Sequence, residues 1–389
     1  MRQNPQRDKL LRRILVFAPS FYPAVRAGGP ARSLTNLVRE LESEFIIDVV
    51  TSDRDLGEAE PFAGLSGRRV TRGLTTVYYL DTSSTNQIVA LLKKLARNRY
   101  DLIVVNSIWE HRYALTPVLL ASLRVLKGPV LLLPRGELEP GALALKSRKK
   151  RLAGPAFRAA YRHGVSVFGA TSRDEADNIR AWFPGRPVVT TTNNLPDSIR
   201  WGEPTNSRPQ LNVLFLSRVD RKKGLRELLR GLQGTTRGIH LSIVGPANDP
   251  EYWQECEQAI TQLPEHVVVT RCELAERHEI PSLLWNADCM VLLTAGENYG
   301  HVIAESLQAG CPVITTPTTP WTDVIRGGGG KIVENRDDAA EVARVLDRWA
   351  GKTTDEFAEA RHQARAAFEE FSARSGPNVI ELALAALYP

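Results

Sequence analysis

Short apolar runs alternate with amphipathic stretches along most of the chain. The runs are rich in valine, isoleucine and leucine and lack alternate polar residues, which is typical of parallel strands buried on both faces. Between the runs, apolar residues recur at helical spacing, as Leu34, Leu37, Val38 and Leu41 do in one stretch. This alternation predicts an α/β fold with doubly wound parallel sheets.

The predicted strands fall into two groups separated by a break. The first group comprises residues 14–18, 45–51, 77–80, 102–106, 130–133 and 164–170, and the second comprises 211–217, 240–244, 267–270, 289–294, 313–316 and 331–333. The break is the sequence PGRP at 184–187, which interrupts both helices and central strands. Because 389 residues exceed one ordinary core, we predict one domain over residues 1–187 and a second over 188–371.

The chain is basic, with a net charge of +6 and a pI of about 9.2. The excess gathers at residues 2–13 and 146–151. No zinc-finger spacing, basic zipper or aromatic RNA-binding strand accompanies these clusters, so we expect no nucleic-acid partner. Phosphorylated substrates or an anionic membrane face account for the charge instead.

The sequence also bears on the compartment. No apolar run has the length of a membrane span, and residues 1–13 lack the apolar middle of a signal peptide. The four cysteines form no C-x-x-C pair, which is typical of reduced thiols. We therefore expect a cytoplasmic protein, with peripheral contact at the inner face of the membrane as a further option.

The stretch over residues 289–317 has the features of a ligand-binding strand end. An apolar strand leads through a loop into a helix over 301–309, so the backbone N–H groups of Gly300, His301 and Val302 offer an anion site. Glu297 and Glu305 flank this helix start, eight positions apart. Carboxylates beside an anion are unfavourable unless they bind something else, and sugar hydroxyls are suitable donors. The pattern favours a nucleotide-sugar; the alternative is an ordinary corner with the second glutamate on a solvated helix face.

A second strand end carries two cations. Arg218 and Lys223 follow the strand predicted at 211–217, and Gly224 opens the next helix. Cations at a helix start oppose the helix dipole, so a structural role explains them poorly. A diphosphate between them supplies a reason, since arginine binds it as a fork and lysine as a point charge.

A glycine pair precedes an early helix. Gly28 and Gly29 stand just before the helix predicted at 31–41 and offer N–H groups to a phosphate. They do not belong to a G-x-G-x-x-G dinucleotide fingerprint, which is absent. A flexible surface turn is the alternative interpretation.

Two of these elements together resemble a known enzyme family. The sequence ENYGHVIAE at 297–305, followed by GCPVI at 310–314, resembles the E-x7-E signature of the retaining glycosyltransferases of family 4. Arg218, Lys223 and Gly224 resemble the R-x4-K-G element of that family. The resemblance implies a GT-B architecture, in which two Rossmann-like, doubly wound parallel-sheet domains face a cleft and close by a hinge motion. Residues 372–389 resemble the terminal helix that crosses back to the first domain.

The resemblance also implies roles for single residues. It places Glu297 against the transferred sugar, Glu305 on the ribose, and the loop of Gly28 and Gly29 over the donor diphosphate. It implies a nucleoside diphosphate sugar as substrate and no cofactor.

The sequence offers one candidate metal motif. Asp53, Arg54 and Asp55 form a D-x-D triplet like the metal site of the other nucleotide-sugar transferase architecture, GT-A. The triplet alone is a weak motif, so we expect it to be incidental and the chain to need no metal.

One loop departs from the more familiar family pattern. The sequence PRGELEP at 134–140 resembles a form of this loop in which arginine stands where many relatives have histidine. Arg135 cannot act as a general base because it stays protonated. We expect it to bind phosphate or acceptor, with Glu137, Glu139 or His111 orienting the acceptor. The alternative is a structural arginine paired with a neighbouring glutamate.

These observations lead to a functional hypothesis. The chain is expected to move a hexose-type sugar from a nucleoside diphosphate to a hydroxyl acceptor with retention, in surface polysaccharide or glycolipid synthesis. A lipid-linked glycan is one candidate for the acceptor. The expected catalytic residues are Glu297, Arg218, Lys223 and Arg135, with the two cations of the second strand end neutralising the leaving diphosphate. Two alternatives remain open: a nucleotide-sugar epimerase of the same architecture, and a non-catalytic subunit that binds nucleotide-sugar.

Overall fold

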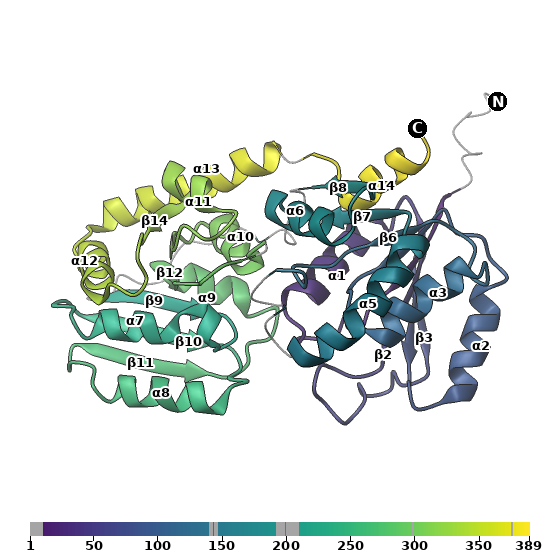
Figure 1. Ribbon diagram of the computed structural model, residues 1–389. Helices are drawn as coiled ribbons and strands as arrows, with labels where there is room; N and C mark the ends of the chain where they lie inside the picture. The colour runs from purple at the N-terminus through teal and green to yellow at the C-terminus, as the bar shows by residue number, and fades with distance from the viewer. Residues whose placement is uncertain are drawn as a thin grey trace, which may run out of the picture. The chain divides into compact units, whose positions relative to one another are not determined.

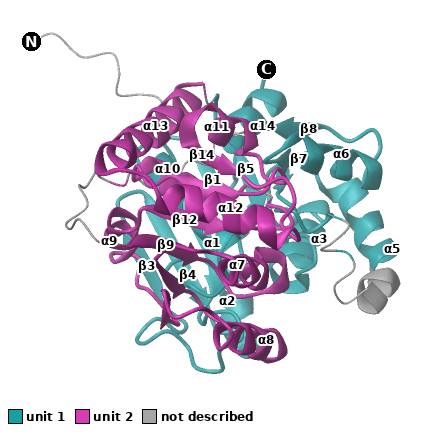
Figure 2. Ribbon diagram, turned by 90° about the vertical axis from the view of Figure 1, so that its left-hand side faces the viewer, with its two compact units in different colours: residues 1–194, 376–389 teal, residues 195–375 magenta. Residues whose placement is uncertain are grey.

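The computed structural model describes residues 11–139, 143, 147–191, 199, 210–297, 299–374 and 376–389, except for the side chains of 147–153. The chain divides into two compact units, residues 1–194 with 376–389 and residues 195–375. Figure 2 shows the C-terminal residues in the colour of the first unit, to which the chain returns. Each unit has its own sheet, which confirms the prediction of two α/β domains.

The first unit contains an eight-stranded sheet in the order β3-β4-β2-β1-β5-β6-β7-β8. Its strands are β1 (Arg13–Phe17), β2 (Ile46–Ser52), β3 (Arg69–Arg72), β4 (Thr75–Leu80), β5 (Leu102–Val105), β6 (Val130–Leu132), β7 (Val167–Ala170) and β8 (Val188–Thr190). All neighbouring pairs are parallel except β3 with β4. The apolar pattern does not predict β3, because three of its four residues are polar and exposed at the sheet edge.

Helices cover both faces of this sheet (Figure 1). They are α1 (Gly29–Leu41), α2 (Thr85–Leu95), α3 (Thr116–Ser122), α5 (Ser147–Gly164), α6 (Arg173–Trp182) and α14 (Val379–Leu387). In β1, Ile14 and Val16 pack with α1 and α14, whereas Leu15 and Phe17 pack with α2, α3, α5 and α6. This two-sided burial is the reason that four successive positions of the strand are apolar.

The segment before β7 differs from the sequence prediction. The strand expected over 164–170 begins only at Val167, because α5 runs to Gly164. This glycine packs against α3, where a Cβ would come within 2.5 Å of Val118 Cγ1 and Ser122 Oγ. The helical pattern of α5 is obscured in the sequence by Pro155 in its interior.

The second unit contains six parallel strands in the order β11-β10-β9-β12-β13-β14. They are β9 (Leu211–Leu216), β10 (Ile239–Val244), β11 (Val267–Cys272), β12 (Cys289–Leu292), β13 (Val313–Thr315) and β14 (Gly330–Ile332). The helices are α7 (Leu225–Leu232), α8 (Pro250–Ile260), α9 (Ile280–Asn286), α10 (His301–Gln308), α11 (Thr322–Val324), α12 (Ala339–Ala350) and α13 (Thr354–Ala373). Every strand predicted in this part of the chain is present, with ends shifted by at most two residues.

The boundaries between the units lie later than the sequence placed them. Strand β8 pairs with β7 in the first sheet, so Val188–Thr190 belongs to the first unit and not to the second. Its short apolar run after a proline fits either an edge strand or a linker, which is why the pattern did not separate the two. At the other end α13 continues to Ala373, and α14 packs on β7 and β8. Within the described residues, no helix is both long and apolar enough to span a bilayer.

Candidate active site

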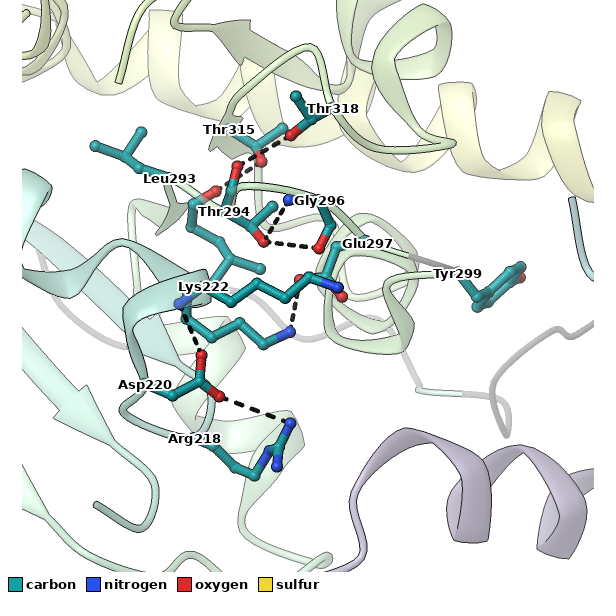
Figure 3. A network of polar contacts seen from close by, with 12 residues as sticks. Arg218, Asp220, Lys222, Leu293, Thr294, Gly296, Glu297, Tyr299, Thr315 and Thr318 are labelled. Atoms are coloured by element: carbon teal, nitrogen blue, oxygen red, sulfur yellow. Dashed lines mark hydrogen bonds and ion pairs between the residues drawn. The ribbon is translucent and has the colours of Figure 1, made fainter. Parts of the chain in front are cut away.

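The structure brings Lys223 and Glu297 together at the carboxyl edge of the second sheet. Lys223 ends the short 3-10 turn Arg221–Lys223 that follows β9, and the Asp220 carboxylate caps this turn by accepting from the Lys222 N–H at 3.0 Å. Lys223 Nζ lies 2.6 Å from Glu297 Oε1, and only 13% and 10% of the two side chains are exposed. Figure 3 shows this network around the loops after β9 and β12. Two residues that are 74 positions apart in the sequence thus form one largely buried ion pair.

Gly224 allows the two loops to meet. It has a left-handed φ of 75°, and a Cβ on it would lie 2.0 Å from the Leu293 carbonyl oxygen. The Ala295 N–H also donates to the Lys222 carbonyl at 2.7 Å. The loop after β9 is therefore packed directly against the end of β12, which fixes where Lys223 emerges.

The backbone around Glu297 is fixed by threonines. Thr294 Oγ1 accepts from the Gly296 N–H at 3.2 Å, and the Glu297 N–H donates to the Thr318 carbonyl at 3.2 Å. Thr316 Oγ1 in turn donates to the Thr294 carbonyl at 2.6 Å. These contacts hold the glutamate on a defined turn (Figure 3).

Arg336 is a member of this site that the sequence analysis missed. Its Nη1 donates to the Leu293 carbonyl at 3.0 Å and to the Lys222 carbonyl at 3.4 Å, and its Nη2 lies 3.5 Å from Glu227 Oε1. The arginine thereby joins the two loops that carry Lys223 and Glu297. The only sequence signal was its place in the loop after β14, since the carboxyl ends of parallel strands share one sheet edge.

Arg218 stands apart from the ion pair. Its Nη2 lies 3.6 Å from Asp220 Oδ2, and 47% of its side chain is exposed. Asp220 therefore contacts both Arg218 and the turn. In the described part of the chain, the two predicted cations share a loop without sharing a partner.

The start of α10 matches the sequence prediction in its backbone. Gly300 is its N-cap, with a left-handed φ of 81°, and no side chain of the described residues caps this end. The helix therefore begins at His301 and Val302 with N–H groups that have no intrahelical acceptor. Glu305 is 5% exposed, so the interpretation that puts it on a solvated face is wrong.

In the first unit, Gly28 and Gly29 begin α1. Gly28 has a φ of 66° and is the N-cap, again without a side-chain cap among the described residues. Its own N–H donates to the Val25 carbonyl at 3.4 Å, a long bond, so the pair offers fewer free donors than the sequence suggested.

Arg135 connects three elements at the carboxyl edge of the first sheet. Its Nε donates to Asn106 Oδ1 at 2.7 Å, after β5, and its Nη1 donates to Ser33 Oγ at 3.1 Å, in α1. Nη2 is buried and has no hydrogen-bond partner in the described part of the chain. Burial lowers the pKa of the Arg135 guanidinium to about 10, and the charge of Glu175 opposes this effect. The side chain therefore remains protonated at neutral pH.

Within the described residues, Arg135 forms no hydrogen bond or ion pair with a neighbouring glutamate. Glu137 instead accepts from Ser107 Oγ at 3.1 Å and from the Ile108 N–H at 2.7 Å. Glu175, which the sequence analysis did not count as a site residue, accepts from the Gly136 N–H at 2.6 Å. Nearby, the His111 side chain is 67% exposed.

The described residues contain no group of three or more histidine, cysteine or acidic side chains arranged to hold a metal ion. Asp53 and Asp55 are buried, and both carboxylates accept hydrogen bonds from protein donors.

Comparison with known proteins finds a glycosyltransferase family in each unit. The family described as "Glycosyl transferase 4-like domain" matches residues 28–194, and "Glycosyl transferases group 1" matches residues 210–351. The chain is 27% identical over 223 residues to a glycogen synthase of Mycobacterium tuberculosis, covering 54% of this chain. It spans about half the length of the curated relatives that it matches.

Solved structures share the fold along nearly the whole chain. Anabaena HepE in complex with UDP-glucose superposes with a TM-score of 0.67 at 16% identity, covering 96% of this chain and 98% of that one. Sucrose-phosphate synthase from Thermosynechococcus elongatus gives 0.68 at 17% identity, covering 97% and 98%. With two family matches that together span most of its length, the chain belongs to the family 4 type of glycosyltransferases and has their GT-B architecture.

Proposed function

We propose that this glycosyltransferase moves a hexose-type sugar from a nucleoside diphosphate to a hydroxyl acceptor, with retention of the anomeric configuration. The observation that carries the proposal is the largely buried pair of Lys223 and Glu297, which lies just before the start of α10, a helix end that no described side chain caps. A diphosphate linked to a sugar fits this strand end. The cation and the helix start would bind the diphosphate, and the carboxylate would bind sugar hydroxyls.

In this proposal the residues of the second unit bind the donor. Lys223 and Arg218 neutralise the leaving diphosphate, together with the N–H groups of Gly300, His301 and Val302. Glu297 then exchanges part of its contact with the lysine for hydroxyls of the transferred sugar. Glu305, buried in α10, holds the ribose.

The first unit is proposed to supply the acceptor side and to complete the phosphate site. The loop of Gly28 and Gly29 covers the donor diphosphate in the substrate-bound enzyme. Arg135 binds phosphate or acceptor and takes no part in proton transfer, because its guanidinium stays protonated. Retention on one face of the sugar lets the leaving phosphate oxygen accept the proton of the acceptor hydroxyl.

Anomeric analysis of the product tests this function. The chain is incubated with α-linked UDP- and GDP-hexoses and a panel of octyl glycosides, with diphosphate release and product linkage followed by NMR. An α-linked product is the expected result, and a β-linked product would overturn retention. Donor epimerisation without an acceptor would favour the epimerase alternative, and donor binding without turnover would favour a non-catalytic subunit.

Activity is expected to survive chelation. Protein cations and helix N–H groups replace the metal that many diphosphate sites use, and Asp53 and Asp55 already bind protein donors. Turnover is therefore measured after extensive dialysis against EDTA and again after adding Mn²⁺ or Mg²⁺. A collapse in chelator that either metal restores would contradict the proposal.

We also propose peripheral contact with anionic membranes, in keeping with a lipid-linked acceptor. Residues 2–10 and the side chains of 146–151 lie outside the described part of the chain. Within it, α5 carries exposed Arg158 and Arg162. The helix α3, which packs against α5, carries exposed Leu119, and exposed Leu123 follows directly after its last residue. Each basic residue near an anionic surface contributes about 1 kcal/mol.

Vesicle flotation checks this contact. Vesicles with anionic lipid are expected to carry the protein at low salt and to release it at high salt, whereas neutral vesicles serve as the control. Protein that stays at the bottom with anionic vesicles at low salt would count against the proposal.

A further inference from the structure

Asp55, the last residue of the D-x-D triplet, accepts hydrogen bonds from the backbone of a distant loop. Asp55 Oδ2 accepts from the N–H groups of Val25 at 2.8 Å and Arg26 at 3.0 Å, and Oδ1 accepts from the Leu56 N–H at 2.7 Å. One carboxylate thus gathers three backbone donors from two chain segments about 30 residues apart. Charged acceptors make roughly twice as strong a hydrogen bond as neutral ones.

These bonds lead directly to the glycine pair of the first unit. The Val25 carbonyl accepts from the Gly28 N–H at 3.4 Å, and the Gly28 carbonyl accepts from the Arg32 N–H at 3.2 Å, in the first turn of α1. A chain of hydrogen bonds therefore runs from the Asp55 carboxylate to the start of the helix. Arg26 adds a second link, since its Nη2 lies 2.7 Å from Glu58 Oε1.

The neighbouring carboxylate has different partners. Asp53 accepts from Arg54 Nε at 2.9 Å and from Ser66 Oγ at 2.6 Å, and within the described residues its carboxylate does not contact the loop before Gly28. Asp53 is 1% exposed and Asp55 is 9% exposed, so both are buried. The two aspartates have the same chemistry and similar burial, but only Asp55 contacts the glycine loop.

We propose that Asp55 is a positioning residue that holds residues 25–28, and with them the start of α1, in the conformation that receives the donor phosphates. Its negative charge does not repel the ligand strongly, because three N–H groups compensate it. The inference rests on the proposed function for its effect on the donor. The three backbone hydrogen bonds of Asp55, called the Asp55 clamp from here on, do not depend on that function.

Asp55→Asn tests the clamp, with Asp53→Asn as the matched control. An asparagine amide has one oxygen instead of two, and its NH₂ group would face a backbone N–H. At least one of the backbone hydrogen bonds of Asp55 is therefore lost without a change in side-chain size. The donor KM of Asp55→Asn is expected to rise by about tenfold, the scale of losing one hydrogen bond to a charged group. Asp53→Asn is expected to lower the melting temperature while leaving the donor KM within about twofold of the unmodified enzyme.

Amide hydrogen exchange measures directly whether residues 25 and 26 are held by hydrogen bonds. On the unmodified chain this measurement requires neither enzyme activity nor a variant that folds. The Val25 and Arg26 amides are expected to be protected, and in Asp55→Asn they should exchange faster while the Phe62 amide, which donates to the Asp53 carbonyl, keeps its rate. Fast exchange of both amides in the unmodified chain would overturn the clamp, as would equal donor KM values in the two variants. If the unmodified chain transfers no sugar, the proposed function fails, but the exchange experiment still decides whether Asp55 holds the loop.

Discussion

Replacing Lys223 with methionine is expected to reduce turnover by about two orders of magnitude or more, the scale of losing one charge-stabilising group at a developing anion. Methionine retains the apolar stem but removes the charge that lies 2.6 Å from Glu297. The pair is largely buried, so the charge acts where water screens it poorly. Arg218→Ala should act in the same direction, but less strongly because Arg218 is half exposed. Initial rates and titration calorimetry with UDP, GDP and ADP measure both turnover and diphosphate binding.

Arg221→Ala is the matched control for Lys223. Arg221 belongs to the same 3-10 turn, but its side chain is 52% exposed and its guanidinium pairs with Glu255. Exposed ion pairs contribute little, so rate and affinity should stay within about twofold of the unmodified enzyme.

A double variant separates charge stabilisation from a structural ion pair. Removing only Lys223 leaves Glu297 partly buried and unpaired, which itself lowers stability. In Lys223→Met/Glu297→Gln the stability should recover, which would assign the stability lost in Lys223→Met to the unpaired carboxylate. Turnover of the double variant should stay low, because both groups proposed to bind the donor are then lost. The assignment would be overturned if Lys223→Met bound diphosphate and turned over within about twofold of the unmodified enzyme.

Local patterns predicted most of the fold because the core strands are buried on both faces. The strand β9 and the helix α7 are examples, since α7 carries Leu225, Leu228, Leu229 and Leu232 at helical spacing. The elements that the pattern did not predict are those whose burial is one-sided or interrupted. The polar edge strand β3 and the helix α5 with its internal proline are both of this kind.

The site was partly predictable for the same reason. Glycines and charges at strand ends have local signatures, so spacing alone made Lys223, Glu297 and Gly300 candidates, and the structure places them at one sheet edge. The contacts of Arg336 and Asp55 have no local sequence signature, because each residue joins segments that are distant in the sequence. Only the fold shows that Arg336 reaches the carbonyls of two site loops.

Arg135→Lys is expected to cut turnover by about two orders of magnitude with the fold intact, because lysine keeps the charge but lacks the planar fork. The guanidinium donates to Asn106 and to Ser33 at the same time, and its Nη2 lacks a partner in the described chain. A buried donor without an acceptor is costly, which favours an anionic substrate group completing its contacts. Arg135→Ala should lose at least as much activity. Initial rates and thermal unfolding are measured together for both variants.

Arg124 supplies the control for backbone strain at this position. Arg124 and Arg135 are the two residues other than glycine in the described chain with positive φ, 58° and 56°, and Arg124 is exposed. Replacing Arg124 by lysine or alanine changes the side chain of a residue with left-handed backbone but removes no buried guanidinium. These variants therefore measure the effect of the backbone conformation alone. If Arg135 binds substrate, UDP should raise the melting temperature of the unmodified chain more than that of Arg135→Lys, since only binding to the folded state stabilises it. The opposite outcome is a lowered melting temperature with near-normal turnover in both Arg135 variants. It would show that Arg135 has only a structural role, in which it connects the ends of β5 and β6 to α1, and would remove it from the site.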